Sequence, residues 1–327
     1  MQRRQALEAG LLVALAGASP RAVAQAARVD DETWNDERRQ RALPLRLRWP
    51  ADDLPLPQGG RPLVLFSHGL GGTRQGGAVW GGAWAAAGFV VLHLQHPGSD
   101  PAALQREARG LANLSGLRDA VSPGQLLQRL ADAVFVLDEV GRRHDGGLGR
   151  WPTVRPQRVG MSGHSFGAHT TLGLAGQASP GHPALTEPRL AAFLAFSPTA
   201  PALAAGSAFA GITRPTLCVT GSRDGDVLGN GATPQRRLAA YAALPAGQKA
   251  LLLLRDADHM SFAGQTGRAT EIGPREAVTR DLQPRHHALV AAISTDWWRS
   301  TLLGEAAAGE RLLHPVGLGQ GDVWQRG

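Results

Sequence analysis

The sequence predicts an α/β fold, in which helices cover both faces of a mostly parallel sheet. Short apolar runs, such as residues 62–67 and 89–94, recur along the chain and stop shortly before a glycine. Segments between the runs, such as residues 125–140, carry apolar side chains at helical spacing. Strands that are apolar on both faces and alternate with helices are typical of a parallel sheet. The predicted strands are 45–49, 62–67, 89–94, 158–161, 190–196, 216–220 and 250–254, and the predicted helices are 125–140, 166–174, 236–244 and 287–298.

Length and composition fit an α/β domain and argue against several other classes. The chain has 327 residues, of which 43% are hydrophobic, so it can bury a full core. No repeat of about 20 to 50 residues is visible, and a solenoid or propeller is therefore not expected. The net charge is +7, but the arginines are spread along the chain, which argues against a nucleic-acid partner. The single cysteine, Cys218, cannot form an internal disulfide, and its apolar surroundings predict a buried strand residue.

Residues 1–26 resemble an export signal. A pair of arginines precedes a short apolar stretch at residues 11–17, and small residues at 22–26 offer an A-x-A cleavage site. The arginine pair also resembles a twin-arginine signal, which predicts a periplasmic or secreted protein. The alternative is an amphipathic extension that stays attached. No stretch reaches the roughly 20 apolar residues of a membrane span, and residues 27–327 are expected to form a single domain.

One motif supplies a candidate nucleophile. Gly163-His164-Ser165-Phe166-Gly167 matches G-x-S-x-G, in which a sharp strand-to-helix turn exposes the serine hydroxyl above the sheet. The pattern alone is weak evidence, because chains rich in Gly and Ser often match it by chance. Its context is the one that the turn requires, with a predicted strand before it and a helix of small residues after it. We therefore predict that Ser165 is a nucleophile rather than an incidental serine in a glycine-rich turn.

A glycine-rich loop after an earlier strand supplies candidate donors for an oxyanion. Attack of a serine on a carbonyl carbon creates a tetrahedral oxyanion, which needs about two backbone N–H donors. The loop at residues 67–72, with sequence SHGLGG, can present an N–H with little side chain in the way. We assign the donors to Leu70 and to Phe166, which follows the nucleophile. A helix-capping turn is the alternative, and a phosphate loop is disfavoured because no G-K-[ST] follows.

The acid and base of a catalytic triad are expected after later strands, in the order Ser, acid, His. Asp224 and Asp226 follow one predicted strand, and His259 follows the next. Both loops lie at strand ends on the same side of the sheet as Ser165, so His259 is the candidate base. The acid must hold the imidazole in one tautomer, and Asp224 is preferred for this role over Asp226.

Other histidines lie near the predicted site without a clear chemical pattern. His68, His93, His96 and His164 are expected to line it. Only the pair at 93 and 96 has a spacing found in metal sites, so no metal is expected. The adjacent histidines at 286–287 fall inside a helical pattern, which indicates a structural role.

The motifs at residues 67–71, 163–167 and 259–263 together resemble those of the platelet-activating-factor acetylhydrolases. The stretch 96–100, with sequence HPGSD, also resembles bacterial proteins known as predicted dienelactone hydrolases. The likeness spans residues 60–265. It implies the α/β-hydrolase fold and a metal-independent esterase or lipase-like activity on short acyl chains, with an ester substrate and no cofactor.

The chain also departs from these families. Dienelactone hydrolases use a cysteine nucleophile where this chain has Ser165, and the acetylhydrolases often carry a further glycine where this chain has Ala168. Secreted polyesterases share the fold and triad. The same triad also supports a peptidase or amidase, and a binding protein with an inactive site is the non-enzymatic alternative. Residues 101–123 are expected to form a short lid that sets acyl-chain length.

Overall fold

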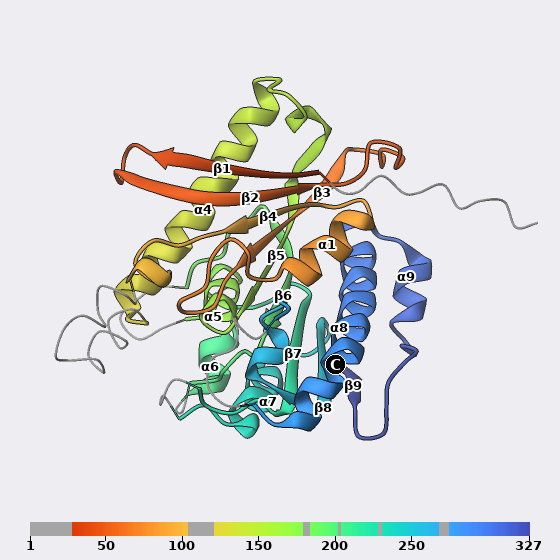
Figure 1. The fold of residues 1–327 in the computed structure, drawn as a ribbon. Helices are drawn as coiled ribbons and strands as arrows, with labels where there is room; N and C mark the ends of the chain where they lie inside the picture. Colours follow the sequence, from red (N-terminus) through yellow and green to blue (C-terminus); the bar gives the residue numbers. More distant parts are fainter. Residues whose placement is uncertain (1–27, 104–120, 179–183, 202–203, 228–230, 268–274) are drawn as a thin grey trace, which may run out of the picture.

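The computed structural model describes residues 28–103, 121–178, 184–201, 204–227, 231–267 and 275–327 (Figure 1). Within these residues the chain forms a nine-stranded sheet in the order β1-β2-β4-β3-β5-β6-β7-β8-β9. The strands are β1 Arg28–Asp36, β2 Arg41–Trp49, β3 Arg61–Ser67, β4 Val90–Leu94, β5 Val154–His164, β6 Leu190–Phe196, β7 Thr216–Arg223, β8 Lys249–Asp258 and β9 Val323–Arg326.

Parallel strands make up the centre of the sheet and antiparallel strands its edges. The run β4-β3-β5-β6-β7-β8 pairs in parallel, as the sequence predicts. β1, β2 and β9 pair antiparallel. The prediction of a single strand at 45–49 before β3 was incomplete, because β1 and β2 form a hairpin there. Only Trp34 and Asp36 of β1 are buried, and a strand with so few buried positions shows no apolar run.

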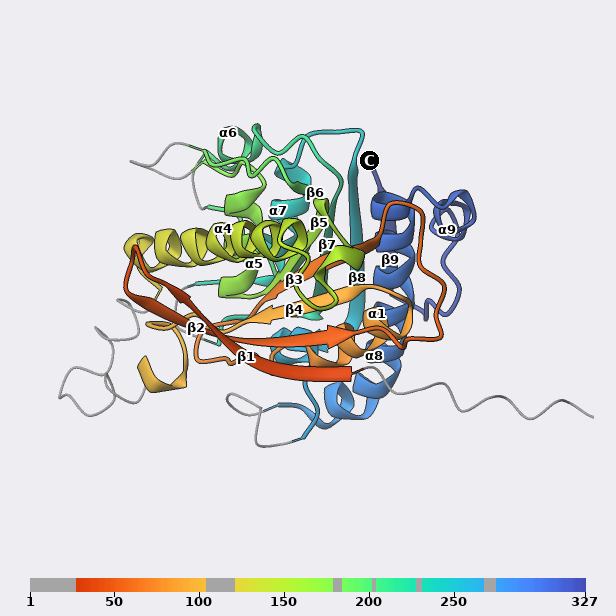
Figure 2. The same cartoon turned by 90° about the horizontal axis from the view of Figure 1, so that it is seen from above.

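Helices cover both faces of the sheet (Figure 2). α4, α5, α6 and α7 lie on one face, and α1, α8 and α9 lie on the other. No described helix is both long enough and apolar enough to cross a bilayer. The helices are α1 Ala78–Ala86, α4 Pro123–Asp145, α5 Phe166–Leu174, α6 Ala205–Phe209, α7 Pro234–Ala243, α8 Ala277–Trp298 and α9 Ala306–Arg311.

Capping residues explain why two helices begin earlier than their apolar spacing predicts. α4 begins at Pro123, and the hydroxyl of Ser122 accepts a hydrogen bond from the N–H of Gln125 at 3.2 Å. α7 begins in the same way at Pro234, with Thr233 as the N-cap. A capping hydroxyl followed by proline satisfies the free amides of a first turn, so it marks a helix start better than apolar periodicity does.

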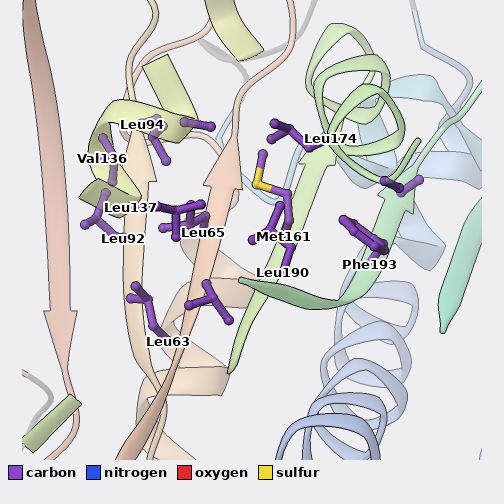
Figure 3. Close-up of a cluster of buried hydrophobic side chains, with 14 of the residues drawn as sticks. Leu63, Leu65, Leu92, Leu94, Val136, Leu137, Met161, Leu174, Leu190 and Phe193 are labelled. Atoms are coloured by element: carbon purple, nitrogen blue, oxygen red, sulfur yellow. The ribbon is translucent and has the colours of Figure 1, made fainter. Parts of the chain in front are cut away.

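Alternate side chains of each central strand enter different core layers. Leu63 and Leu65 of β3 pack with β4, α4 and α5 on one face (Figure 3). Val64 and Phe66, between and after them, pack with α1 and α8 on the other face. Full burial of each large apolar side chain contributes about 1.5–3 kcal/mol. Because both faces are covered, the strands are apolar throughout, which is why the sequence pattern identified them.

Candidate active site

Ser165 occupies the turn between β5 and α5. β5 ends at His164 and α5 begins at Phe166, so the serine itself makes the turn. Its backbone has φ 56° and ψ −114°, a conformation that costs an L-residue on the order of 1–3 kcal/mol. The N–H of Ser165 donates to the carbonyl of Phe196 on β6 at 3.0 Å. Neighbouring strands thus hold a strained serine at the rim of the sheet, as the motif predicts.

The two motif glycines are required by close approach of the backbone. A Cβ on Gly163 would lie 2.3 Å from the carbonyl oxygen of Gly167, and a Cβ on Gly167 would lie 1.9 Å from that of Ser67. Neither glycine has a positive φ; Ser165 carries the unusual angle. The glycines therefore let the end of β3 and the first turn of α5 meet backbone to backbone.

Asp224 and His259 meet at the ends of two neighbouring strands. β7 and β8 are paired as far as Arg223 and Asp258, which places the next residue of each strand side by side. The Nδ1 atom of His259 lies 2.8 Å from Oδ1 of Asp224. Because a carboxylate can only accept, Nδ1 carries the proton and Nε2 is left free to act as a base.

Several groups hold the Asp224 carboxylate in its charged form. Burial raises the pKa of Asp224, but His259 and Arg237 outweigh it and the pKa falls to about 2. Arg237 of α7 places its Nε 3.1 Å from Oδ1 of Asp224. The hydroxyl of Thr220 donates to Oδ2 of Asp224 at 2.8 Å. The Asp224 carboxylate is therefore ionised at neutral pH and fixed in orientation.

Asp226 occupies a different place from Asp224. Its Oδ2 accepts a hydrogen bond from the N–H of Gly231 at 2.5 Å, and its side chain lines a cavity. Of the two candidate acids, the structure pairs Asp224 with His259.

The loop after β3 lies against the nucleophile. A Cβ on Gly69 would lie 3.3 Å from the Cβ of Ser165, and the side chains of Leu70 and Phe166 pack together in a small buried cluster. The N–H of Phe166 belongs to the first turn of α5, where amides have no acceptor within the helix and the dipole favours negative charge. The structure therefore places Leu70 and Phe166 close to Ser165, and their role as oxyanion donors stays a prediction.

Two cavities meet at the candidate nucleophile. The larger, of about 520 Å³, lies between α4, α5 and α7, and its walls include Leu126 and Leu130. The smaller, of about 370 Å³, lies over the loop after β3. Ser165, Val227 and His259 line both. A carbonyl group at Ser165 has room for one substituent in each cavity.

The histidines around the site make separate hydrogen bonds rather than a shared metal site. Nδ1 of His93 lies 2.8 Å from a backbone carbonyl, and Nε2 of His164 lies 3.0 Å from the carbonyl of His259. Nε2 of His68 accepts from the N–H of His96 at 2.9 Å. Across the described part of the chain, no group of three or more potential metal ligands gathers. Burial holds the pKa of His68 and of His164 well below its ordinary value, so both are neutral.

A second Ser–His–Asp chain lies behind the loop after β3. Nδ1 of His96 lies 2.9 Å from Oδ2 of Asp132, and Nε2 of His96 lies 3.0 Å from Oγ of Ser67. All three residues are fully buried. The guanidinium of Arg129 donates to Oγ of Ser67 at 2.9 Å, and Arg41 donates to both carboxylate oxygens of Asp132.

This second cluster and Arg237 were not predicted from the sequence. Arg129 and Asp132 belong to the buried side of α4, three residues apart and beside Leu130 and Ala133. A charged pair on the apolar face of an amphipathic helix was the available signal, because buried charges are rarely tolerated unless they are paired. Arg237 gave no comparable signal, since it follows another arginine at the start of a helix.

The fold and the site geometry together define a protein of the α/β-hydrolase type, with a serine at a strand–helix turn and an Asp–His pair at the ends of later strands. Residues 49–107 match the family model described as platelet-activating factor acetylhydrolase, isoform II, which the chain resembles. The matched segment contains β3, β4 and the loop with Leu70, and it ends before Ser165.

A solved structure supports the assignment of the fold. The chain is similar to the structure of a cold-adapted esterase from an Arctic intertidal metagenomic library, with a TM-score of 0.51 and 14% identity. The similarity covers 80% of this chain and 94% of the esterase. At this identity the likeness concerns the fold alone. No curated protein sequence matches the chain.

Proposed function

We propose that the chain is a serine esterase that hydrolyses carboxylic esters of short acyl chains, with Ser165, His259 and Asp224 as its triad. The observation that carries the proposal is the buried Asp224–His259 hydrogen bond of 2.8 Å beside cavities that His259 shares with the strained Ser165. The resemblance to acetylhydrolases and the fold shared with an esterase support an ester as the substrate.

In the proposed reaction, Nε2 of His259 takes the proton of Ser165 as the serine Oγ attacks the ester carbonyl. The N–H groups of Leu70 and Phe166 hold the oxyanion, and Asp224 stabilises the imidazolium. His259 then gives the proton to the departing alcohol. A water molecule, deprotonated by His259, then attacks the acyl carbon. The bond to Oγ of Ser165 breaks, His259 returns the proton to that oxygen, and the acid is released. These steps need no group beyond the side chains and amides named here.

The described C-terminal end of the region expected to be a lid lines the larger cavity. Most of residues 101–123 lies outside the described residues, but Val121, Ser122 and Pro123 line that cavity beside Leu126. We propose that this segment limits acyl-chain length. Replacing it with a short glycine–serine linker should broaden the range of chain lengths that are hydrolysed, and an unchanged profile would contradict the proposed lid.

The proposed activity is tested by hydrolysis of p-nitrophenyl esters from acetate to decanoate, beside the matching p-nitroanilides. We expect the highest kcat/KM on the short esters and little turnover of anilides. Ser165→Ala should abolish turnover, whereas Ser207→Ala, at an exposed position of α6, should keep it. Preference for anilides would indicate an amidase, preference for long esters a lipase or polyesterase, and a folded protein without turnover an inactive binding protein.

We also propose that the protein is periplasmic or secreted and that residues 27–327 form one domain. The expected signal at residues 1–26 lies outside the described residues, and the proposal depends on its sequence pattern. Mass spectrometry of the protein recovered after expression with its own N-terminus would measure cleavage near residue 26. An intact N-terminus in the cytoplasmic fraction alone would contradict it.

A further inference from the structure

Arg129 connects the elements that surround the candidate nucleophile. Its guanidinium is fully buried and makes a bond to each of several segments. Nη2 donates to Oγ of Ser67 at 2.9 Å and to the carbonyl of His68, at the end of β3. Nη1 donates to Oγ of Ser99 at 2.9 Å, in the loop after β4, and Nε donates to Oγ1 of Thr170 on α5 at 3.0 Å.

The same guanidinium supports both residues that carry the predicted oxyanion donors. Its Cζ lies 4.5 Å from the ring centroid of Phe166, a cation–π distance. The side chain of Leu70 packs against Phe166 in turn. Arg129 therefore contacts the helix that carries one donor and the strand end that leads to the other.

A chain of hydrogen bonds fixes Arg129 and assigns every proton in it. The Asp132 carboxylate accepts from Nδ1–H of His96, so Nε2 of His96 must accept from the hydroxyl of Ser67. The lone pairs of that hydroxyl then face Nη2 of Arg129. Removing the Ser67 hydroxyl would therefore remove two bonds of this network, the one to His96 and the one from Arg129.

The peptide that carries the Leu70 N–H is held in orientation by His68 and His96. Nε2 of His68 accepts from the N–H of His96, so the ring proton is on Nδ1, which donates to the carbonyl of Gly69 at 2.6 Å. In a trans peptide the N–H points opposite to the carbonyl. Holding the Gly69 carbonyl therefore fixes the direction of the Leu70 N–H.

We propose that Arg129, held in place through Asp132, His96 and Ser67, is a positioning residue for the oxyanion hole. It joins the loop that carries Leu70 to the helix that carries Phe166 and so sets the spacing of the two N–H donors. The inference rests on the proposed esterase function. Displacement of catalytic groups by about 1 Å can cost roughly 100-fold in rate, so a rigid connection between the two donors has a direct kinetic effect.

The chain offers a matched pair of variants to test this role. Thr170 and Thr171 are adjacent, fully buried residues of α5, and each hydroxyl donates to the carbonyl four residues earlier. The hydroxyl of Thr170 also accepts the bond from Arg129. Thr170→Val and Thr171→Val therefore remove the same local bond, and only the first removes a contact with Arg129. Arg129→Lys is a third variant, which keeps the charge but lacks the planar fork.

The readouts are kcat and KM for p-nitrophenyl acetate, and the inhibition constant of a trifluoromethyl ketone. The ketone adduct places an oxyanion on the same two donors. We expect Arg129→Lys to lower kcat roughly 10- to 100-fold with little change in KM, and to weaken the ketone by a similar factor. Thr170→Val should likewise lower kcat and weaken the ketone with little change in KM, but by a smaller factor of roughly 3- to 10-fold. Thr171→Val should stay within about twofold of the wild type, and Thr170→Ser should restore the rate.

Outcomes for the inference and for the proposed function are distinct. Wild-type turnover combined with equal kcat values for Thr170→Val and Thr171→Val would overturn the positioning role alone. A change in KM with unchanged kcat would do the same. A folded wild type that neither hydrolyses esters nor reacts with a fluorophosphonate would overturn the proposed function, and the inference with it. If Arg129→Lys does not fold, the threonine pair decides.

Discussion

The protein holds two sets of Ser, His and Asp residues: the proposed triad of Ser165, His259 and Asp224, and the hydrogen-bonded chain of Ser67, His96 and Asp132. They differ in what surrounds the serine. In both, Nδ1 of the histidine faces the aspartate, at 2.8 Å for His259–Asp224 and 2.9 Å for His96–Asp132. Ser165 has a strained backbone and lines two cavities. Ser67 is the last residue of β3 and is fully buried.

We infer that a hydrogen bond from a serine to a His–Asp pair does not by itself make the serine a nucleophile. Arg129 already donates to the hydroxyl of Ser67, which occupies a lone pair and blocks the approach of a carbonyl carbon. Ser165 lines two cavities, lies beside the residues predicted to carry the oxyanion donors and occupies a strained turn. In our proposal, the same three residue types serve chemistry at one position and support it structurally at the other.

The largest expected effect separates the two candidate acids. Asp224→Asn should lower kcat by roughly 10⁴-fold, because an amide stabilises the wrong tautomer of His259 and cannot offset the imidazolium charge. Asp226→Asn should cost far less, because Asp226 makes a turn contact with Gly231. Steady-state hydrolysis of p-nitrophenyl acetate measures both. Equal losses would break the assignment of Asp224 as the acid.

Replacing the aspartate of the Ser67–His96–Asp132 hydrogen-bond chain should lower the stability of the fold. Asp132→Ala removes the buried partner of Arg41, Arg39 and His96, and uncompensated buried charges typically cost about 3–5 kcal/mol. Urea denaturation measures the free energy of unfolding. Asp138→Ala on the same helix, where the ion pair with Arg189 is exposed, should cost less than about 1 kcal/mol. A similarly small loss for Asp132→Ala would contradict the role of Asp132 as a buried partner of charged groups.

Removing the second serine should have a moderate effect. Ser67→Ala leaves Nε2 of His96 and Nη2 of Arg129 each short of a partner, for which about 1–3 kcal/mol of stability is expected. Because Arg129 keeps its bonds to Thr170 and Ser99, ester turnover should fall by roughly tenfold at most. A loss as large as that of Ser165→Ala would mean that Ser67 takes part in the chemistry.

The pH dependence of stability should show that His96 is neutral in the folded protein. Burial and the charge of Arg129 lower the pKa of His96, and they outweigh Asp132, which raises it. The pKa of His96 falls to about 4, against an ordinary value of 6.5. Between these values the unfolded chain binds a proton that the folded chain does not. The contribution of neutral His96 to the free energy of unfolding is therefore full above pH 6.5. It is lost as the pH falls towards 4, by at most about 1.4 kcal/mol per pH unit.

Urea denaturation at several pH values between 4 and 7 measures this slope. His96→Gln should reduce the slope by about one proton. An unchanged slope in His96→Gln would indicate that His96 is charged in the folded protein.

The parallel centre of the sheet and the candidate site residues were predictable from sequence, because both follow from strong local rules. Strands buried on both faces are apolar throughout, and catalytic loops follow the carboxyl ends of parallel strands. The start of α5 at Phe166 follows from the motif itself. The edge strands β1 and β9 were not predicted, because an exposed edge strand needs few apolar residues and its register comes from the partner.

The second Ser–His–Asp chain could not be predicted because its members come from three separate segments. Ser67 ends β3, His96 follows β4, and Asp132 belongs to the middle of α4. Only the packing of α4 on the sheet brings them together, and no sequence spacing records that contact. His96 was expected near the site, but its partners depend on where a helix side chain enters the core.

The most direct test of the central claim is to find which serine is activated. The folded wild-type protein is treated with a fluorophosphonate, and the labelled peptide is identified by mass spectrometry. We expect a single adduct on Ser165, lost in His259→Ala and retained in Thr171→Val. An adduct on Ser67, or no adduct on a protein that hydrolyses esters, would contradict the account.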